Sequence, residues 1–267
     1  MKLLHSEIIK LVHQKRSYVG WGGLLAVPLL MSLAMYLERS NLQGVDPLIR
    51  FALHDGLLVP IGAIWLLTPL LLPMLAAMAG AYQLAGEAET GTIKTWLMHS
   101  ISRGGVLASK WGVGVIYLAF GLLLVFLGGL AGGGLAFGLH APVLLSGETV
   151  SVAYGLWLIL LAYLYVLAGA LCVLSLALLF ATLTNSSLTA AIAALVVFIV
   201  MNILGTFSYF DFLQPYLFTS HLGDWQNLLG QPIFWHPIIT GQLCFALWST
   251  GLMTLAWYLF RGKDVLV

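Results

Sequence analysis

The chain has 267 residues, of which 61% are hydrophobic and 8% are charged, and its net charge is +1. A soluble domain carries about 25% charged residues, so this composition excludes an ordinary soluble fold and predicts an all-α integral membrane protein. The near-zero net charge excludes the basic excess that nucleic-acid binding requires. Both cysteines, Cys172 and Cys244, lie in apolar runs, which predicts buried side chains and no disulfide framework.

The N-terminal residues show an amphipathic pattern ahead of the first apolar run. Apolar residues recur there at helical spacing: Leu3, Leu4, Ile8, Leu11 and Val12. This spacing predicts a helix that lies in the cytoplasmic interface, and a basic anchor that only sets topology is the alternative. The run Val19–Leu37 is long enough to cross a bilayer and no A-x-A cleavage site follows it, so we expect a retained span and not a signal peptide.

Six segments are long and apolar enough to cross a bilayer, which takes about 20 residues because the hydrocarbon core is about 30 Å thick. They cover residues 18–37, 57–82, 111–137, 152–181, 188–206 and 239–260. The uncharged run Thr149–Phe210 forms two spans, because the turn-forming residues 182–187 interrupt it. Two G-x-x-x-G pairs within residues 128–133 favour close packing inside the chain, with a dimer contact as the alternative.

Lysine and arginine are distributed unevenly around these spans. If both termini and the loop 83–110 are cytoplasmic, that side holds nine of the 11 Lys and Arg residues, and the other side holds Arg39 and Arg50. The positive-inside rule therefore predicts cytoplasmic termini. The segment 207–238, between the last two spans, interleaves aromatic residues, polar residues and prolines. That pattern predicts helices that lie at the outer interface or dip partway into the membrane.

The sequence contains no convincing catalytic constellation. It has no G-x-x-x-x-G-K-[ST] phosphate loop and no H-E-x-x-H zinc pair, and spans two to six hold no Asp, Glu, Lys or Arg. The missing intramembrane charges argue against a proton-coupled pump or an ion channel. Asp211 and Asp224 share one interfacial segment, which disfavours an intramembrane aspartyl protease. The seven histidines match no ligand spacing, so we expect no metal and no cofactor on this chain.

The most specific stretch lies between the second and third spans, in residues 83–110. Thr90 or Thr92 is placed to cap a short helix that begins near residue 93, and Gly104 follows its end. Three apolar side chains then share one face at i, i+3, i+4 spacing: Ile93, Trp96 and Leu97. The pattern predicts a short amphipathic helix parallel to the membrane, and a solvated loop is the alternative.

The same stretch contains a Glu-x-Glu-x-Gly-Thr motif followed by a Ser-Arg pair and a lysine. These residues are Glu87, Glu89, Gly91, Thr92, Ser102, Arg103 and Lys110. The arrangement resembles the second cytoplasmic motif of ABC-2 type permeases, the transmembrane subunits of one class of ATP-binding cassette exporters. Residues 6–16 and the ending 260–265 also resemble that family's interfacial helix and basic terminus. Ser100 departs from the pattern, since the family often has proline before the Ser-Arg pair.

The resemblance implies a single ABC-2 type transmembrane domain over residues 1–267, in the cell membrane. It implies two cytoplasmic ATPase subunits, which hold ATP and Mg²⁺, and a second permease subunit, identical or related. The implied ATPase-coupling residues are Glu87, Glu89, Gly91, Thr92, Ile93, Trp96, Leu97, Ser102 and Arg103. The implied outer gate is a partly re-entrant segment that contains Phe210, Phe212, Tyr216 and Phe218.

The resemblance extends to function. The N-terminal Lys-Arg-Ser is most similar to permeases of bacteriocin or lantibiotic self-immunity, or of a bacitracin-export-like branch, which implies export of a hydrophobic or amphipathic substrate such as an antimicrobial peptide. Two other classes fit the same topology: a membrane-embedded enzyme, and a non-transporting sensor or scaffold. An enzyme needs polar groups that converge within the spans, and the sequence shows none.

Overall fold

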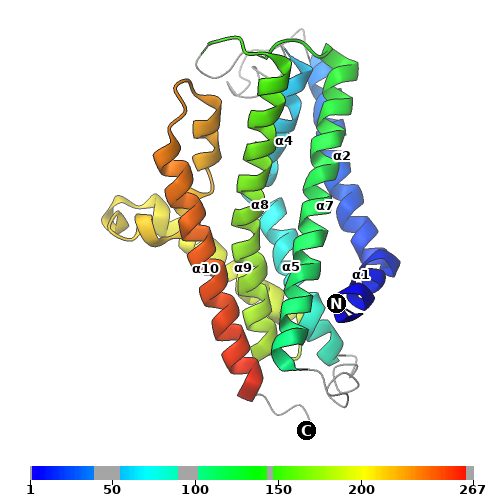
Figure 1. The fold of residues 1–267 in the computed structure, drawn as a ribbon, viewed down its shortest axis with the longest axis vertical. Helices are drawn as coiled ribbons and strands as arrows, with labels where there is room; N and C mark the ends of the chain where they lie inside the picture. Colours follow the sequence, from blue (N-terminus) through cyan, green and yellow to red (C-terminus); the bar gives the residue numbers. More distant parts are fainter. Residues whose placement is uncertain (1, 39–54, 90–101, 143–146, 263–267) are drawn as a thin grey trace.

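The computed structural model describes residues 2–38, 55–89, 102–142 and 147–262, and this part of the chain is an α-helical bundle (Figure 1). The longer helices are α1 Lys2–His13, α2 Lys15–Glu38, α4 Val59–Leu67, α5 Leu71–Glu89, α7 Arg103–Phe137, α8 Val152–Leu183, α9 Ser187–Thr206 and α10 Trp235–Gly262. The predicted coupling residues Gly91, Thr92, Ile93, Trp96 and Leu97 lie outside the described residues.

Within the described residues, five helices are long and apolar enough to cross a membrane: α2, α7, α8, α9 and α10. The 3₁₀ helix η1 (Gly56–Leu58) with α4, followed by α5, gives a sixth crossing if the bent pair counts as one span. The predicted span over 57–82 corresponds to this bent pair, but the prediction did not include the break, where the axis turns by 63° between Leu67 and Leu71. Pro69 explains the break, since proline has no N–H for the carbonyl four residues earlier and its ring clashes there.

The helices on either side of residues 90–101 are longer than predicted. α5 continues to Glu89, and α7 begins at Arg103, where the Ser102 hydroxyl oxygen accepts a hydrogen bond from the Gly105 N–H at 3.2 Å. Most of the expected loop 83–110 is therefore helical. The spanning helices α5 and α7 carry Glu87 and Lys110 near their ends, which corrects the expectation that these charges lie in a loop.

α8 is the central helix and packs against α5, α9 and α10, while α2 packs along α7. Within the most apolar 18 residues of each helix, 72% of α8 is buried, but only 22% of α9 and 28% of α10. The turn predicted at residues 182–187 is confirmed, since α8 ends at Leu183 and α9 begins at Ser187. α9 and α10 therefore present much of their apolar surface to the surroundings of the chain.

The two G-x-x-x-G pairs of α7 face other helices of the same chain. A Cβ at Gly128 would lie 2.9 Å from the side chain of Leu25 on α2, and one at Gly129 would lie 2.9 Å from Pro60 on α4. Gly132 faces α2 and Gly133 faces η1 in the same way. The intrachain interpretation of this motif is supported, because added side chains would separate α7 from both neighbours.

Four 3₁₀ helices form the 207–234 segment between α9 and α10: η2 Ser208–Phe210, η3 Gln214–Tyr216, η4 Phe218–His221 and η5 Asp224–Leu229. In Figure 1 this segment, yellow to orange, lies beside the beginning of α10. The end of α5, the start of α7 and the end of α10 lie together at the lower end of the bundle. The chain thus separates its most charged helix ends from its aromatic 3₁₀ segment.

Candidate coupling site

Four charged side chains meet near the end of the bundle where α5 ends and α7 begins. We call this group the ionic cluster: Glu7 and Lys10 from α1, Glu87 from α5 and Lys110 from α7. Lys110 is 103 residues from Glu7 in the sequence. The cluster therefore exists only because the fold brings three separate helices together.

Lys110 lies at the centre of the ionic cluster. Its Nζ is 2.6 Å from Glu7 Oε2 and 2.5 Å from Glu87 Oε1. The Lys110 and Glu7 side chains are only 3% and 6% exposed. Lys10 Nζ lies 2.8 Å from Glu7 Oε1 and 2.9 Å from Glu87 Oε1. Two ammonium groups and two carboxylates cancel, which is the condition under which charges are tolerated away from water.

The α1 side of the cluster stays ionised at neutral pH. Burial alone raises the pKa of Glu7, but the charges and hydrogen bonds of Lys110 and Lys10 outweigh it and leave that pKa below its ordinary value. Burial alone lowers the pKa of Lys10, but Glu7 and Glu87 outweigh it and leave that pKa raised. Helix α1 is thus bound to α5 and α7 by ion pairs, in addition to any contact its apolar face makes with lipid.

Glu89, the last residue of α5, binds the first residue of α9. Its Oε1 accepts a hydrogen bond from the Ser187 backbone N–H at 2.7 Å, and its Oε2 accepts one from the Ser187 hydroxyl at 2.9 Å. The first N–H groups of a helix lack partners within the helix, and the helix dipole favours a negative charge there. Glu89 therefore stabilises the start of α9 and attaches it to α5.

Arg103, the first residue of α7, binds the last turn of α10. Its guanidinium donates to the carbonyl oxygens of Phe260 and Arg261, both at 2.9 Å. The last carbonyls of a helix lack partners within the helix, and the dipole favours a positive charge at this end. Of the predicted coupling residues that the structure describes, Glu89, Ser102 and Arg103 thus bind helix ends, and Glu87 belongs to the ionic cluster.

The comparison with known protein families gives a clear result. The family described as "ABC-2 family transporter protein" matches residues 1–243. The chain belongs to the ABC-2 transporter family. The match includes the ionic cluster and both borders of residues 90–101. A search of curated proteins found no match to the chain. ABC-2 membership and the apolar helices together make this a multi-pass membrane protein and a transporter subunit of the kind that associates with an ABC ATPase.

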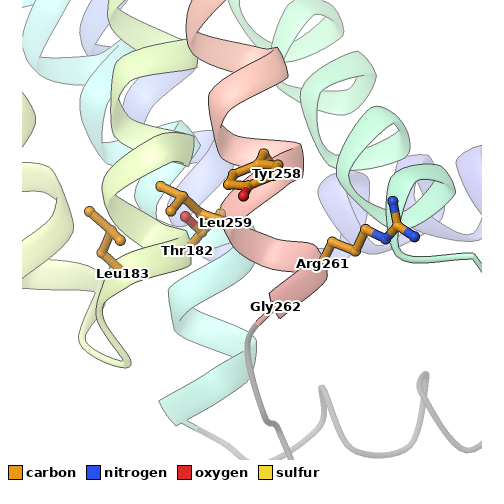
Figure 2. A pocket seen from close by; sticks show the side chains of 6 residues that line it. All are labelled: Thr182, Leu183, Tyr258, Leu259, Arg261 and Gly262. Carbon is orange, nitrogen blue, oxygen red and sulfur yellow. The ribbon is translucent and has the colours of Figure 1, made fainter.

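An open pocket of about 680 Å³ lies at the same end of this ABC-2 chain, between the ends of α8 and α10 (Figure 2). Its lining residues are Thr182, Leu183, Tyr258, Leu259, Arg261 and Gly262. In Figure 2 the Arg261 side chain points away from Thr182 and Leu183, and its guanidinium carbon is 5.8 Å from the Trp257 ring. These lining residues offer no carboxylate, histidine or thiol for acid–base or nucleophilic chemistry.

The four predicted gate residues of the ABC-2 chain occupy different environments. Phe212 and Tyr216 are 68% and 72% exposed, and Phe210 is half-buried. Phe218 is completely buried, with ring centroids 6.2 Å from Phe198 of α9 and 5.6 Å from Trp248 of α10. The structure therefore assigns Phe218 to the packing between α9 and α10.

The carboxylates of the 207–234 segment have separate partners. Asp224 Oδ2 is 2.8 Å from His221 Nδ1, and Asp211 Oδ1 accepts a hydrogen bond from Gln214 at 2.8 Å. Burial raises the pKa of Asp224, although His221 partly offsets the shift. Within the described ranges, no three His, Cys, Asp or Glu side chains are grouped so as to hold a metal ion.

Sequence reasoning found Glu87 and Lys110 through the motif but missed what they bind. Glu7 and Lys10 lie within residues 6–16, for which the sequence predicts only an interfacial helix, and Ser187 lies within the predicted turn. One signal was present: few charges flank the spans, and Glu87 and Lys110 lie within two helical turns of a predicted membrane boundary. Charges at that depth need partners, and opposite signs on the same side of the membrane would have paired them.

Proposed function

We propose that this chain is the permease subunit of an ABC exporter whose ATP is bound, with Mg²⁺, and hydrolysed on two separate cytoplasmic subunits. The observation that carries the proposal is the family match together with the anchoring of both borders of residues 90–101. Glu87 and Glu89 hold the preceding border and Arg103 holds the following one. A loop that receives force from another subunit needs borders that are fixed to the helices it moves.

The coupling element in this proposal is the amphipathic segment 92–101. Ile93, Trp96 and Leu97 form its apolar face, and Trp96 is the largest group on it. Large aromatic side chains commonly dominate interface energies, at about 2 kcal/mol or more on truncation. The charged residues at the borders bind within the chain, which leaves this apolar face as the contact for the ATPase.

The assembly consists of two permease subunits, identical or related, in the cell membrane with both termini in the cytoplasm. The charge asymmetry of the sequence supports that orientation. Its substrate is a hydrophobic or amphipathic compound such as an antimicrobial peptide, as in the transporters that the N-terminal Lys-Arg-Ser resembles. The exposed aromatic residues Phe212 and Tyr216 belong to the gate of this exporter, in a partly re-entrant segment.

The experiment is Trp96→Ala, assayed by co-purification of the ATPase and by transport, both normalised to inserted protein. We expect the variant to insert normally and to lose ATPase binding or transport per complex. Trp157→Ala is the matched control, because Trp157 is 54% exposed near the start of α8 and distant in sequence from the coupling segment. Normal ATPase binding and transport in Trp96→Ala would remove this helix from the mechanism. Reduced insertion with normal turnover would make Trp96 a lipid anchor.

A further inference from the structure

The two border residues of segment 90–101 each bind one of the helices that flank the 207–234 segment. Glu89 binds the start of α9, which ends at Thr206, and Arg103 binds the end of α10, which begins at Trp235. We propose that Glu89 and Arg103 are positioning residues that carry motion of the coupling segment through α9 and α10 to the 207–234 segment. This inference rests on the proposed function, because that function supplies the motion.

Each connection is made by two hydrogen bonds to a helix end. The Glu89 carboxylate uses one oxygen for the Ser187 N–H and the other for its hydroxyl, at 2.7 and 2.9 Å. The Arg103 guanidinium donates to two successive carbonyls of α10, both at 2.9 Å. Charged hydrogen bonds are stronger than neutral ones. A displacement of either border therefore moves a helix end and not only a side chain.

Helices α9 and α10 are long enough to carry such a displacement to the 207–234 segment. α9 has 20 residues and α10 has 28, and at about 1.5 Å per residue they are roughly 30 and 42 Å long. The ionic cluster meanwhile joins α1, α5 and α7 to one another. A displacement of these three connected helices therefore reaches α9 through Glu89, at the end of α5, and α10 through Arg103, at the start of α7.

The far end of α9 and the middle of α10 both bind the 207–234 segment. Gln214 of η3 donates to the Gly205 carbonyl near the end of α9 at 3.2 Å, and Trp248 of α10 donates to the Tyr216 carbonyl of η3 at 2.7 Å. The buried ring of Phe218 is packed between Phe198 of α9 and Trp248 of α10. Because η3 and η4 contact both helices, a shift of α9 against α10 must rearrange this segment.

The test uses the complex of this chain with its ATPase and a cysteine reporter in the 207–234 segment. Tyr209→Cys places the reporter at a side chain that is 84% exposed, while both native cysteines are buried. The rate of labelling by a membrane-impermeant maleimide is measured with and without ATP, and is divided by the amount of bound ATPase. The chain without the added cysteine gives the background.

We expect ATP to change the labelling rate of the reporter, and Glu89→Ala or Arg103→Gln to reduce that change about fivefold or more. Glu89→Asp and Arg103→Lys should restore part of the response, because they keep the charge at the helix end. Glu148→Ala, which removes an exposed carboxylate elsewhere, should respond like the parent chain. If Glu89→Ala does not fold, Glu89→Gln replaces it and should give an intermediate loss.

The inference and the proposed function fail in different ways. If the parent reporter responds to ATP and the Glu89 and Arg103 variants respond equally per bound ATPase, the inference is wrong and the proposed function stands. If no ATPase binds the parent chain, the proposed function is wrong and the inference falls with it. If the ATPase binds but the parent reporter ignores ATP, the inference alone is wrong, because no motion reaches the 207–234 segment. A loss in the variants that the charge-conserving substitutions fail to restore also contradicts the positioning role.

Discussion

Substitution of Lys110 by methionine tests the ionic cluster, because it removes the central ammonium group and keeps most of the aliphatic side chain. The change leaves two carboxylates, Glu7 and Glu87, around a single cation, Lys10. Glu7 is only 6% exposed and loses the partner that lay 2.6 Å away. Water has little access to the site, so the remaining negative charge is poorly solvated.

The magnitude follows from this burial. Removal of one partner of a buried ion pair costs about 3–5 kcal/mol. Lys10 remains within 2.9 Å of Glu87 and 2.8 Å of Glu7, so we expect the lower limit, about 3 kcal/mol, for Lys110→Met. The double variant Glu7→Gln/Lys110→Met restores charge balance. It should be more stable than the sum of the single effects predicts, by about 1–3 kcal/mol.

The assay is equilibrium unfolding by SDS titration in mixed micelles, with the free energy of unfolding measured for both single variants and the double variant. Lys15→Met is the matched control, because Lys15 is exposed and such a change usually alters stability by less than about 0.5 kcal/mol. If Lys110→Met matches this control, or if the two single effects simply add, the ionic cluster does not hold the helices together.

Three further predictions follow from the charges and the missing phosphate loop. Glu7 has a lowered pKa. Its contribution to the free energy of unfolding is therefore fully present above the ordinary pKa of 4.5 and is lost as pH falls through the folded-state pKa. Glu7→Gln should weaken the dependence of the melting temperature on pH on the acid side. Single cysteines at Ser40 and Ser146 should react with an impermeant reagent outside intact cells, and external labelling at Ser186 would sink the six-span topology. The purified chain alone should not bind ATP in equilibrium dialysis. Stoichiometric binding would contradict the prediction that this chain has no ATP site of its own.

The helices were largely predictable because the membrane imposes a simple requirement. Long uncharged runs must form helices there, since backbone groups find no water to bind. The turn at 182–187 was visible in its polar residues, and the structure ends α8 and starts α9 within it. The break after Leu67 was missed because Pro69 lies in a long uncharged run, where hydropathy alone does not register a missing N–H.

The candidate site was only partly predictable. The motif identified Glu87, Glu89 and Arg103, but the contacts of these residues depend on how distant helices meet. Arg103 is 157 residues from Phe260, and Glu89 is 98 residues from Ser187. Helical periodicity describes one segment at a time and gives no information on such pairs. The coupling role of these residues stays a prediction, and the structure adds that Glu89 and Arg103 bind helix ends of their own chain while Glu87 pairs with Lys110 and Lys10.

The central claim is that this chain transports substrate with ATP hydrolysed on separate subunits. The most direct measurement is the rate of ATP hydrolysis by the complex purified through this chain, before and after the partner is stripped away and then restored. We predict that the complex hydrolyses ATP, that the stripped chain does not, and that hydrolysis returns when the partner is added back. Full hydrolysis by the stripped chain, or a purified chain that never carries an ATPase, would contradict the account.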